Sequence, residues 1–121
     1  MRPIDDSRPN VSVAQRTACI RALNDQLRCA HRGGIVMLSA GIAGAGAAFA
    51  AKALLAISQF NTFDAGNDPY GEHDFGRVTV DGQSVLFKID AYDRSLRLHS
   101  PDAADPLVTR RVMTVMLAEE Y

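Results

Sequence analysis

The chain has 121 residues, of which 47% are hydrophobic and 22% are charged, and its formal net charge is −1. This length and composition are typical of a single globular domain that buries one core without disulfides or metal as structural supports. The nearly neutral charge argues against a dedicated nucleic-acid-binding protein, so we expect no direct contact with nucleic acid.

The first half of the chain predicts two helices separated by a strand. Residues 1–11 carry two prolines, several charges and no periodicity, which is typical of a flexible leader before one domain over 12–121. Ser12 can cap a helix over 12–30, whose apolar residues recur on one face while the other face is wet. The apolar run 35–38 indicates a buried strand, and the Ala- and Leu-rich segment 47–60 indicates a second helix.

The second half predicts a hairpin and a final helix. Asp81-Gly82 is a strong two-residue turn signal between strands over 75–80 and 83–90. Asp105 suits the N-cap of a helix over 107–120, with Pro106 at its first position. The expected fold class is therefore α+β, a small and mainly antiparallel sheet with three packed helices in the order α-β-α-β-β-α.

Neither a membrane span nor a disulfide fits the sequence. Gly33–Ala51 has no charge, but five Gly and seven Ala among its 19 residues make it too weakly apolar for insertion. Cys19 and Cys29 lie ten residues apart in one predicted helix, a separation of roughly 15 Å, which is too far for a bridge. Because no apolar signal segment precedes them, we expect reduced core or interface thiols in a cytoplasmic protein.

The stretch from Asn67 to Gly76, Asn-Asp-Pro-Tyr-Gly-Glu-His-Asp-Phe-Gly, is the most informative part of the chain. Its three acids and one His could hold a divalent metal or supply general acid and base groups. The spacing matches neither a calcium loop nor a zinc helix, so a turn in which the acids accept backbone amides is the favoured interpretation. Whether it binds metal therefore stays undecided at this stage.

The predicted hairpin brings a further carboxylate to this stretch. A turn centred between Asp81 and Gly82 places Asp90 opposite His73, and Asp93 begins a second polar loop. Like charges in such proximity would raise a pKa, unless a neighbouring Lys or Arg neutralises them. The candidate binding residues are Asn67, Asp68, Tyr70, Glu72, His73, Asp74, Asp90 and Asp93.

The ten-residue stretch, together with Phe87-Lys-Ile-Asp90 and Ser100-Pro-Asp102, resembles a family of small bacterial proteins catalogued as a domain of unknown function. The resemblance runs from about Ile20 to Tyr121. It implies a short cytoplasmic protein, often encoded on mobile elements, and it carries no assigned catalytic residues.

Charge asymmetry and this resemblance favour a non-enzymatic binding protein. Residues 1–60 carry seven Lys or Arg against three Asp or Glu, whereas residues 61–121 carry six against eleven. We therefore expect an acidic loop face that engages a protein partner, with a host defence complex (an anti-CRISPR-like role) as one concrete target.

Two further hypotheses stay open. The first is a small metal-assisted hydrolase that uses Asp68, Glu72, His73 and Asp74, with Asp90 as an additional group. The second is a homodimer through the Ala- and Gly-rich helix. No cofactor is expected, because the glycines at 41, 44 and 46 stand in the wrong order for a dinucleotide fingerprint.

Overall fold

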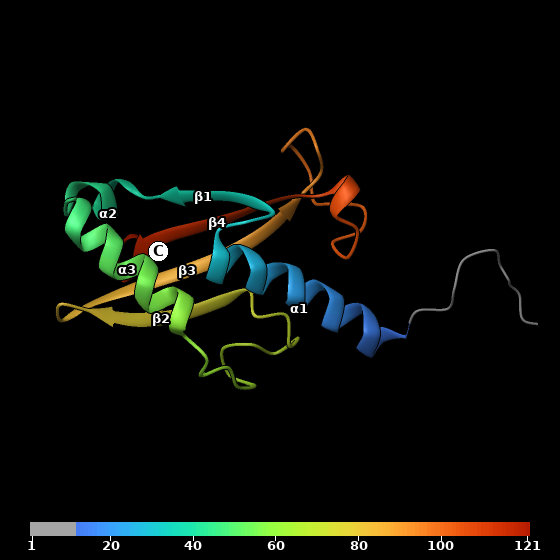
Figure 1. Ribbon diagram of the computed structural model, residues 1–121, viewed down its shortest axis with the longest axis horizontal. Coiled ribbons are helices and arrows are strands. Elements are labelled where there is room, and N and C mark those ends of the chain that lie inside the picture. The colour runs from blue at the N-terminus through green and yellow to red at the C-terminus, as the bar shows by residue number, and fades with distance from the viewer. Residues whose placement is uncertain (1–11) are drawn as a thin grey trace, which may run out of the picture.

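A computed structural model describes residues 12–121 and shows three helices packed on one face of a four-stranded sheet (Figure 1). The strand order is β1-β4-β3-β2, with β1 parallel to β4 and the other two pairings antiparallel. The α+β class is thus confirmed, but the sheet is mixed and the element order differs from the expected one. The predicted leader lies outside the described residues.

The first helix, α1 (Val13–Ala30), has the predicted bounds. Ser12 caps it: its hydroxyl accepts from the Gln15 amide, while the Gln15 side chain accepts from the Ser12 amide. The helix ends at His31, whose φ of 55° lies in the left-handed region. The chain then enters β1 (Gly34–Leu38), which confirms the predicted strand. Its expected burial is wrong, because β1 lies at the edge of the sheet and leaves Met37 and Leu38 exposed.

The segment after β1 forms two helices. A short helix, α2 (Ala40–Gly44), lies between the predicted strand and the predicted second helix, where the sequence predicted no element; the Ser39 hydroxyl accepts from the Ile42 amide and caps it. The predicted second helix follows as α3 (Ala47–Gln59). Among the described residues, no helix is both long and apolar enough to cross a membrane.

The hairpin has the predicted register. Strands β2 (Phe75–Val80) and β3 (Gln83–Tyr92) pair Val80 with Gln83 around the Asp81-Gly82 turn, where both residues have positive φ. The pairing continues to the start of β2, and the Ile89 amide donates to the Asp74 carbonyl at 2.8 Å. Asp90 therefore lies beside the His73-Asp74 segment, as expected.

The predicted final helix over 107–120 is wrong. This segment forms β4 (Arg110–Leu117), flanked by the short 3-10 helices η1 (Pro106–Val108) and η2 (Ala118–Glu120). Strand β4 lies between β1 and β3 and is buried on both faces, so its apolar residues are nearly continuous. Periodicity alone cannot separate such a strand from a buried helix, and pairing with two neighbours decides in favour of the strand.

The core lies between the helices and the inner face of the sheet. Phe87, Met113 and Val115 on this face have 0% exposure, and the helices contribute side chains such as Leu27 and Ile57. Gly76, the last residue of the motif, packs directly on Phe87: a Cβ there would lie 2.5 Å from the Phe87 ring. Glycine at this position is therefore required by a close approach rather than by a turn.

The cysteines differ from expectation in their burial. Cys19 and Cys29 are both free and exposed, so neither is a core thiol. Cys19 lies on the surface of α1 with its thiol 3.4 Å from the Ala104 carbonyl oxygen, and Cys29 is placed similarly against the Ser58 carbonyl.

Candidate functional site

Polar side chains on α1 hold the loop 61–74 against the body of the protein. The Arg21 Nε donates to the Gly71 carbonyl at 2.7 Å, and the Asn24 Nδ2 donates to the Glu72 carbonyl at 2.9 Å. Arg28 donates to the carbonyls of Ile57 and Phe60, where the chain leaves α3. Asn24 and Arg28 each have 4% exposure, so the helix face that carries Arg28, expected to be wet, is partly buried.

Arg28 also joins the aromatic cluster beneath the loop. Its guanidinium carbon lies 5.2 Å from the Phe63 ring centroid and 5.9 Å from that of Phe87. A guanidinium over aromatic faces is stabilised by the ring quadrupoles, and here the two rings surround a cation whose other partners are carbonyls and Asp25. The loop is therefore fixed by packing as well as by hydrogen bonds.

Asp68 serves as an internal brace of the motif. Its side chain is only 4% exposed, and its Oδ1 accepts from the amides of Glu72 and His73 at 3.0 and 3.1 Å. Such a carboxylate satisfies buried backbone donors that the loop conformation leaves without partners. This is the structural turn role that the sequence left open for the acids of the motif.

His73 occupies a position between two carboxylates. Its Nδ1 lies 2.9 Å from the Asp25 Oδ1, its Nε2 lies 3.8 Å from the Asp68 Oδ2, and its ring stacks on Phe63 at a centroid distance of 3.8 Å. Asp25 in turn accepts from Arg28 at 2.8 Å. His73 thus connects the motif to α1, on the inner side of the loop rather than at its surface.

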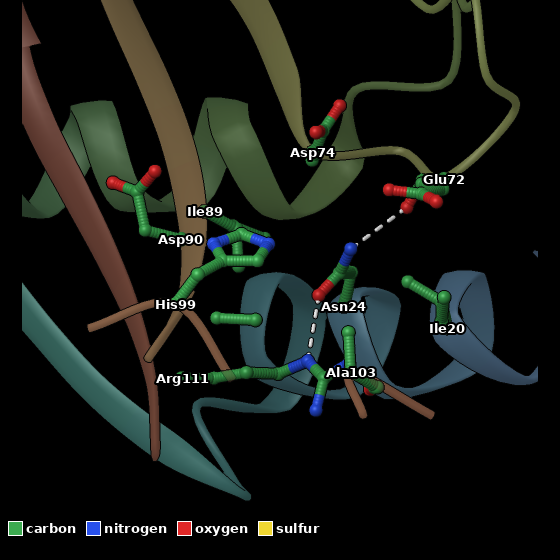
Figure 2. A pocket seen from close by; sticks show the side chains of 10 residues that line it. Ile20, Asn24, Glu72, Asp74, Ile89, Asp90, His99, Ala103 and Arg111 are labelled. Atoms are coloured by element: carbon green, nitrogen blue, oxygen red, sulfur yellow. Dashed lines mark hydrogen bonds between the residues drawn. The ribbon is translucent and has the colours of Figure 1, made fainter. Parts of the chain in front are cut away.

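The remaining acids of the motif line a small pocket of about 110 Å³ (Figure 2). Glu72 and Asp74 come from the loop before β2, Asp90 comes from β3, and Arg111 and His99 complete the polar lining. The pairing of β2 with β3 brings the carboxylates of Asp74 and Asp90 to the same end of the sheet. Figure 2 shows Asn24 between Glu72 and Arg111, hydrogen-bonded to both residues.

The carboxylates of this pocket repel one another. Burial raises the pKa of Glu72, and the nearby charges of Asp74 and Asp68 raise it further. Burial likewise raises the pKa of Asp74, with smaller contributions in the same direction from Asp68 and Asp90. Among residues 12–121, neither Glu72 nor Asp74 forms an ion pair within 4.0 Å. The charges of Arg16 and Arg111 lower the pKa of Glu72, so the described part of the chain offsets the negative charge of the pocket only in part.

Asp90 differs from its two neighbours, because Lys88 lies 2.8 Å from its Oδ2. The hydrogen bond to Asp90 raises the pKa of Lys88. This is the neutralising cation that the sequence offered as an alternative, and its ion pair is with Asp90.

Arg111 is a buried cation at the base of the pocket. It is 3% exposed, donates from Nε to the Asn24 Oδ1 at 2.8 Å and donates from a terminal nitrogen to the Ala103 carbonyl. Burial lowers its pKa, and the charge of Glu72 acts in the opposite direction. Arg111 thus connects the loop carrying Glu72 to the second polar loop.

The structure assigns different positions to the other predicted residues. Asn67 closes a turn, accepting from the Asp64 amide and donating to the Thr62 carbonyl. Tyr70 is 77% exposed at the loop tip. Asp93 braces the second loop by accepting from Ser95 and from the amides of Arg97 and Leu98, and these bonds lower its pKa.

Sequence reasoning missed the residues that position the loop, namely Arg21, Asn24, Asp25, Arg28 and Arg111. One signal was present for Asn24, which stands in the apolar stripe between Ile20 and Leu27. A polar residue in such a stripe is buried and needs partners, which the loop and Arg111 supply. For metal binding, no group of three or more His, Cys, Asp or Glu side chains over the described range is arranged to hold an ion.

The fold and the pocket define a small α+β protein with a carboxylate-lined site. A family model described as "Protein of unknown function (DUF3768)" matches residues 38–120, and the chain belongs to that family. The match includes the whole ten-residue motif but not α1, whose side chains hold the motif in place. No curated protein and no solved structure matches the chain.

Proposed function

We propose that this protein is a non-enzymatic binding module that receives a cationic side chain of a protein partner in the pocket of Glu72, Asp74 and Asp90. The observation that carries the proposal is the pair of partly buried carboxylates, Glu72 and Asp74, whose pKa values are raised and which form no ion pair over residues 12–121. A cation placed between them relieves their repulsion and gains charge-assisted hydrogen bonds.

The size of the pocket favours a side chain over a metabolite. Ligand sites for small molecules generally enclose about 300–1,000 Å³, whereas this pocket has about 110 Å³. The end of one Arg or Lys side chain fits such a volume. Two exposed apolar side chains lie close in sequence to pocket residues: Tyr70, 77% exposed, precedes Glu72 by two positions, and Leu98, 70% exposed, precedes His99. Such side chains could contact the rest of a partner. The acidic balance of residues 61–121 would steer a basic surface toward this end of the protein.

The decisive experiment compares two charge-matched variants. Glu72→Gln with Asp74→Asn removes two of the three pocket carboxylate charges, those that form no ion pair over residues 12–121. Asp81→Asn with Glu119→Gln removes two charges elsewhere on the surface. Chemical-shift titrations with capped arginine and capped lysine peptides report binding at the pocket amides, and affinity capture from the native host reports the partner. We expect the pocket variant to lose both signals and the control to keep them. Equal behaviour of the two variants would contradict the proposal.

The identity of the partner rests on the resemblance noted from the sequence. A host defence complex, as in an anti-CRISPR-like role, remains the candidate that a mobile-element setting implies. Co-purification followed by mass spectrometry of the captured proteins tests this candidate directly.

The hydrolase hypothesis has less support. Asp68 and His73 are engaged by backbone amides, Asp25 and Phe63, which leaves only Glu72 and Asp74 of its four residues lining the pocket. Elemental analysis and thermal shift with Mn²⁺, Mg²⁺, Ca²⁺ and Zn²⁺ test it. A stoichiometric metal with a raised melting temperature would favour the enzyme over the binding module.

A further inference from the structure

We propose that two copies of this protein associate through the free edge of β1. The two β1 strands pair antiparallel around a twofold axis at Val36 and join the two sheets into one continuous sheet. This surface is independent of the carboxylate pocket, and the proposal does not rest on the proposed function.

Strand β1 is an edge strand with backbone groups directed outward. It pairs with β4 on one side only, and Figure 1 shows no other described element alongside its second edge. The Ser39 amide donates to the Val115 carbonyl, so the backbone groups of Ile35 and Met37, at two-residue steps from Ser39, also face β4. The backbone groups of Gly34, Val36 and Leu38 therefore face the open edge.

This edge lacks the features that normally prevent strand pairing. Edge strands are usually protected by Lys, Pro, a bulge or an inward charge, and Gly34–Leu38 contains neither a charge nor a proline. The uncharged stretch continues from Gly33 through Ala51, although the chain has 27 charged side chains elsewhere. Met37 and Leu38 remain 53% and 38% exposed. An uncharged apolar edge of this kind is suited to being covered by another strand.

A second copy suits this edge better than a charged partner surface does, because the edge itself carries no charge. Pairing centred on Val36 places Leu38 opposite the partner's Gly34. The large side chain of Leu38 then faces a residue that has no side chain. The same register sets Met37 beside the partner's Ile35 on the outer face of the sheet. The twofold axis brings one uncharged edge against another, so no charge is buried without a counter-charge.

The strand pairing gives up to about six backbone hydrogen bonds, two for each of the three facing pairs formed by Gly34, Val36 and Leu38. A five-residue strand covers less surface than the roughly 800 Å² per partner of a standard interface. We therefore expect a weak dimer with a dissociation constant on the order of micromolar.

Sedimentation velocity of the full chain over a concentration series from about 1 to about 500 µM tests the proposal, because this range brackets a micromolar constant. The informative variant is Met37→Lys, which places a charge at the edge in the manner of natural edge strands. The matched control is Leu55→Lys, which adds the same charge at a similarly exposed position, 57%, on α3. We expect dimerisation to weaken at least tenfold in Met37→Lys and to be unchanged in the control.

Amide hydrogen exchange identifies the edge itself. In a β1-paired dimer the amides of Gly34, Val36 and Leu38 become protected as concentration rises, while those of Ile35 and Met37 are protected by β4 at every concentration. A monomer over the whole range, equal weakening by the two Lys variants, or a dimer whose Val36 amide stays unprotected would each overturn the proposal. In the last case a different surface, or a strand from another protein, would have to account for the exposed edge.

Discussion

Replacing Asp68 by Ala and by Asn separates the two contributions of this buried carboxylate. Its Oδ1 is the acceptor for two backbone amides, those of Glu72 and His73, and its negative charge acts on the pocket. Asp68→Ala leaves two partly buried N–H groups without an acceptor. A fully buried group of this kind costs about 1–3 kcal/mol, and water reaches these two in part, so we expect a loss of about 2–4 kcal/mol in the free energy of unfolding. Asn retains an acceptor oxygen at the same place, and its expected loss is about 1 kcal/mol or less.

Urea unfolding followed by circular dichroism measures both losses, provided that the m-value is unchanged. A second measurement comes from the charge: because Asp68 raises the pKa values of Glu72 and Asp74, Asp68→Asn should lower both in an NMR titration of their side-chain carboxyl carbons. If Asn were as destabilising as Ala, the acceptor role would be refuted. If the pKa values of Glu72 and Asp74 did not fall, the electrostatic description of the pocket would be wrong.

Three more predictions follow from the contacts described above. Gly76→Ala should destabilise the fold by about 1–3 kcal/mol, because the new Cβ meets the Phe87 ring at 2.5 Å; an unchanged urea midpoint would contradict this. Arg28→Leu should lower the free energy of unfolding by about 2–4 kcal/mol, because it leaves the carbonyls of Ile57 and Phe60 without their donor. Urea unfolding measures this loss, and a value below about 1 kcal/mol would show that water replaces the guanidinium. The pKa values of Glu72 and Asp74 lie above their ordinary 4.5 and 3.8, so folding holds their protons more tightly, and their contribution to stability is present at low pH and is lost as pH rises through the raised values. Glu72→Gln with Asp74→Asn should therefore flatten this decline and increase stability near neutral pH, and a decrease there would refute the assignment.

The hairpin was predictable because its determinants are local. Asp81-Gly82 selects a two-residue turn with positive φ at both positions, and the turn fixes the register of every following pair. The capped first helix was predictable for the same reason, since Ser12 and Gln15 are near one another in sequence. The proximity of Asp90 to Asp74 follows directly from the register.

Strand β4 and the anchoring role of α1 depend on contacts between distant parts of the chain. Val112 to Leu117 could be a buried helix or a central strand, and only pairing with β1 and β3 decides between them. Arg28 is typical of a solvated helix face until the end of α3 and Phe63 pack against it. The residue types in the sequence thus located the site. Only the three-dimensional structure shows which acids hold the loop in place, as Asp68 does, and which line the pocket, as Glu72 and Asp74 do.

The central position of β4 has a consequence for protein synthesis. Strand β1 emerges from the ribosome early, but its neighbour in the sheet is made almost 80 residues later (Gly34 pairs with Arg111). Until residues 110–117 have left the exit tunnel, β1 and the β2–β3 hairpin cannot be joined, and each exposes an unpaired edge. The nascent chain therefore passes through a state in which both edges of the future β4 site are open. Premature termination before residue 110 would leave two sheet fragments with no strand to connect them.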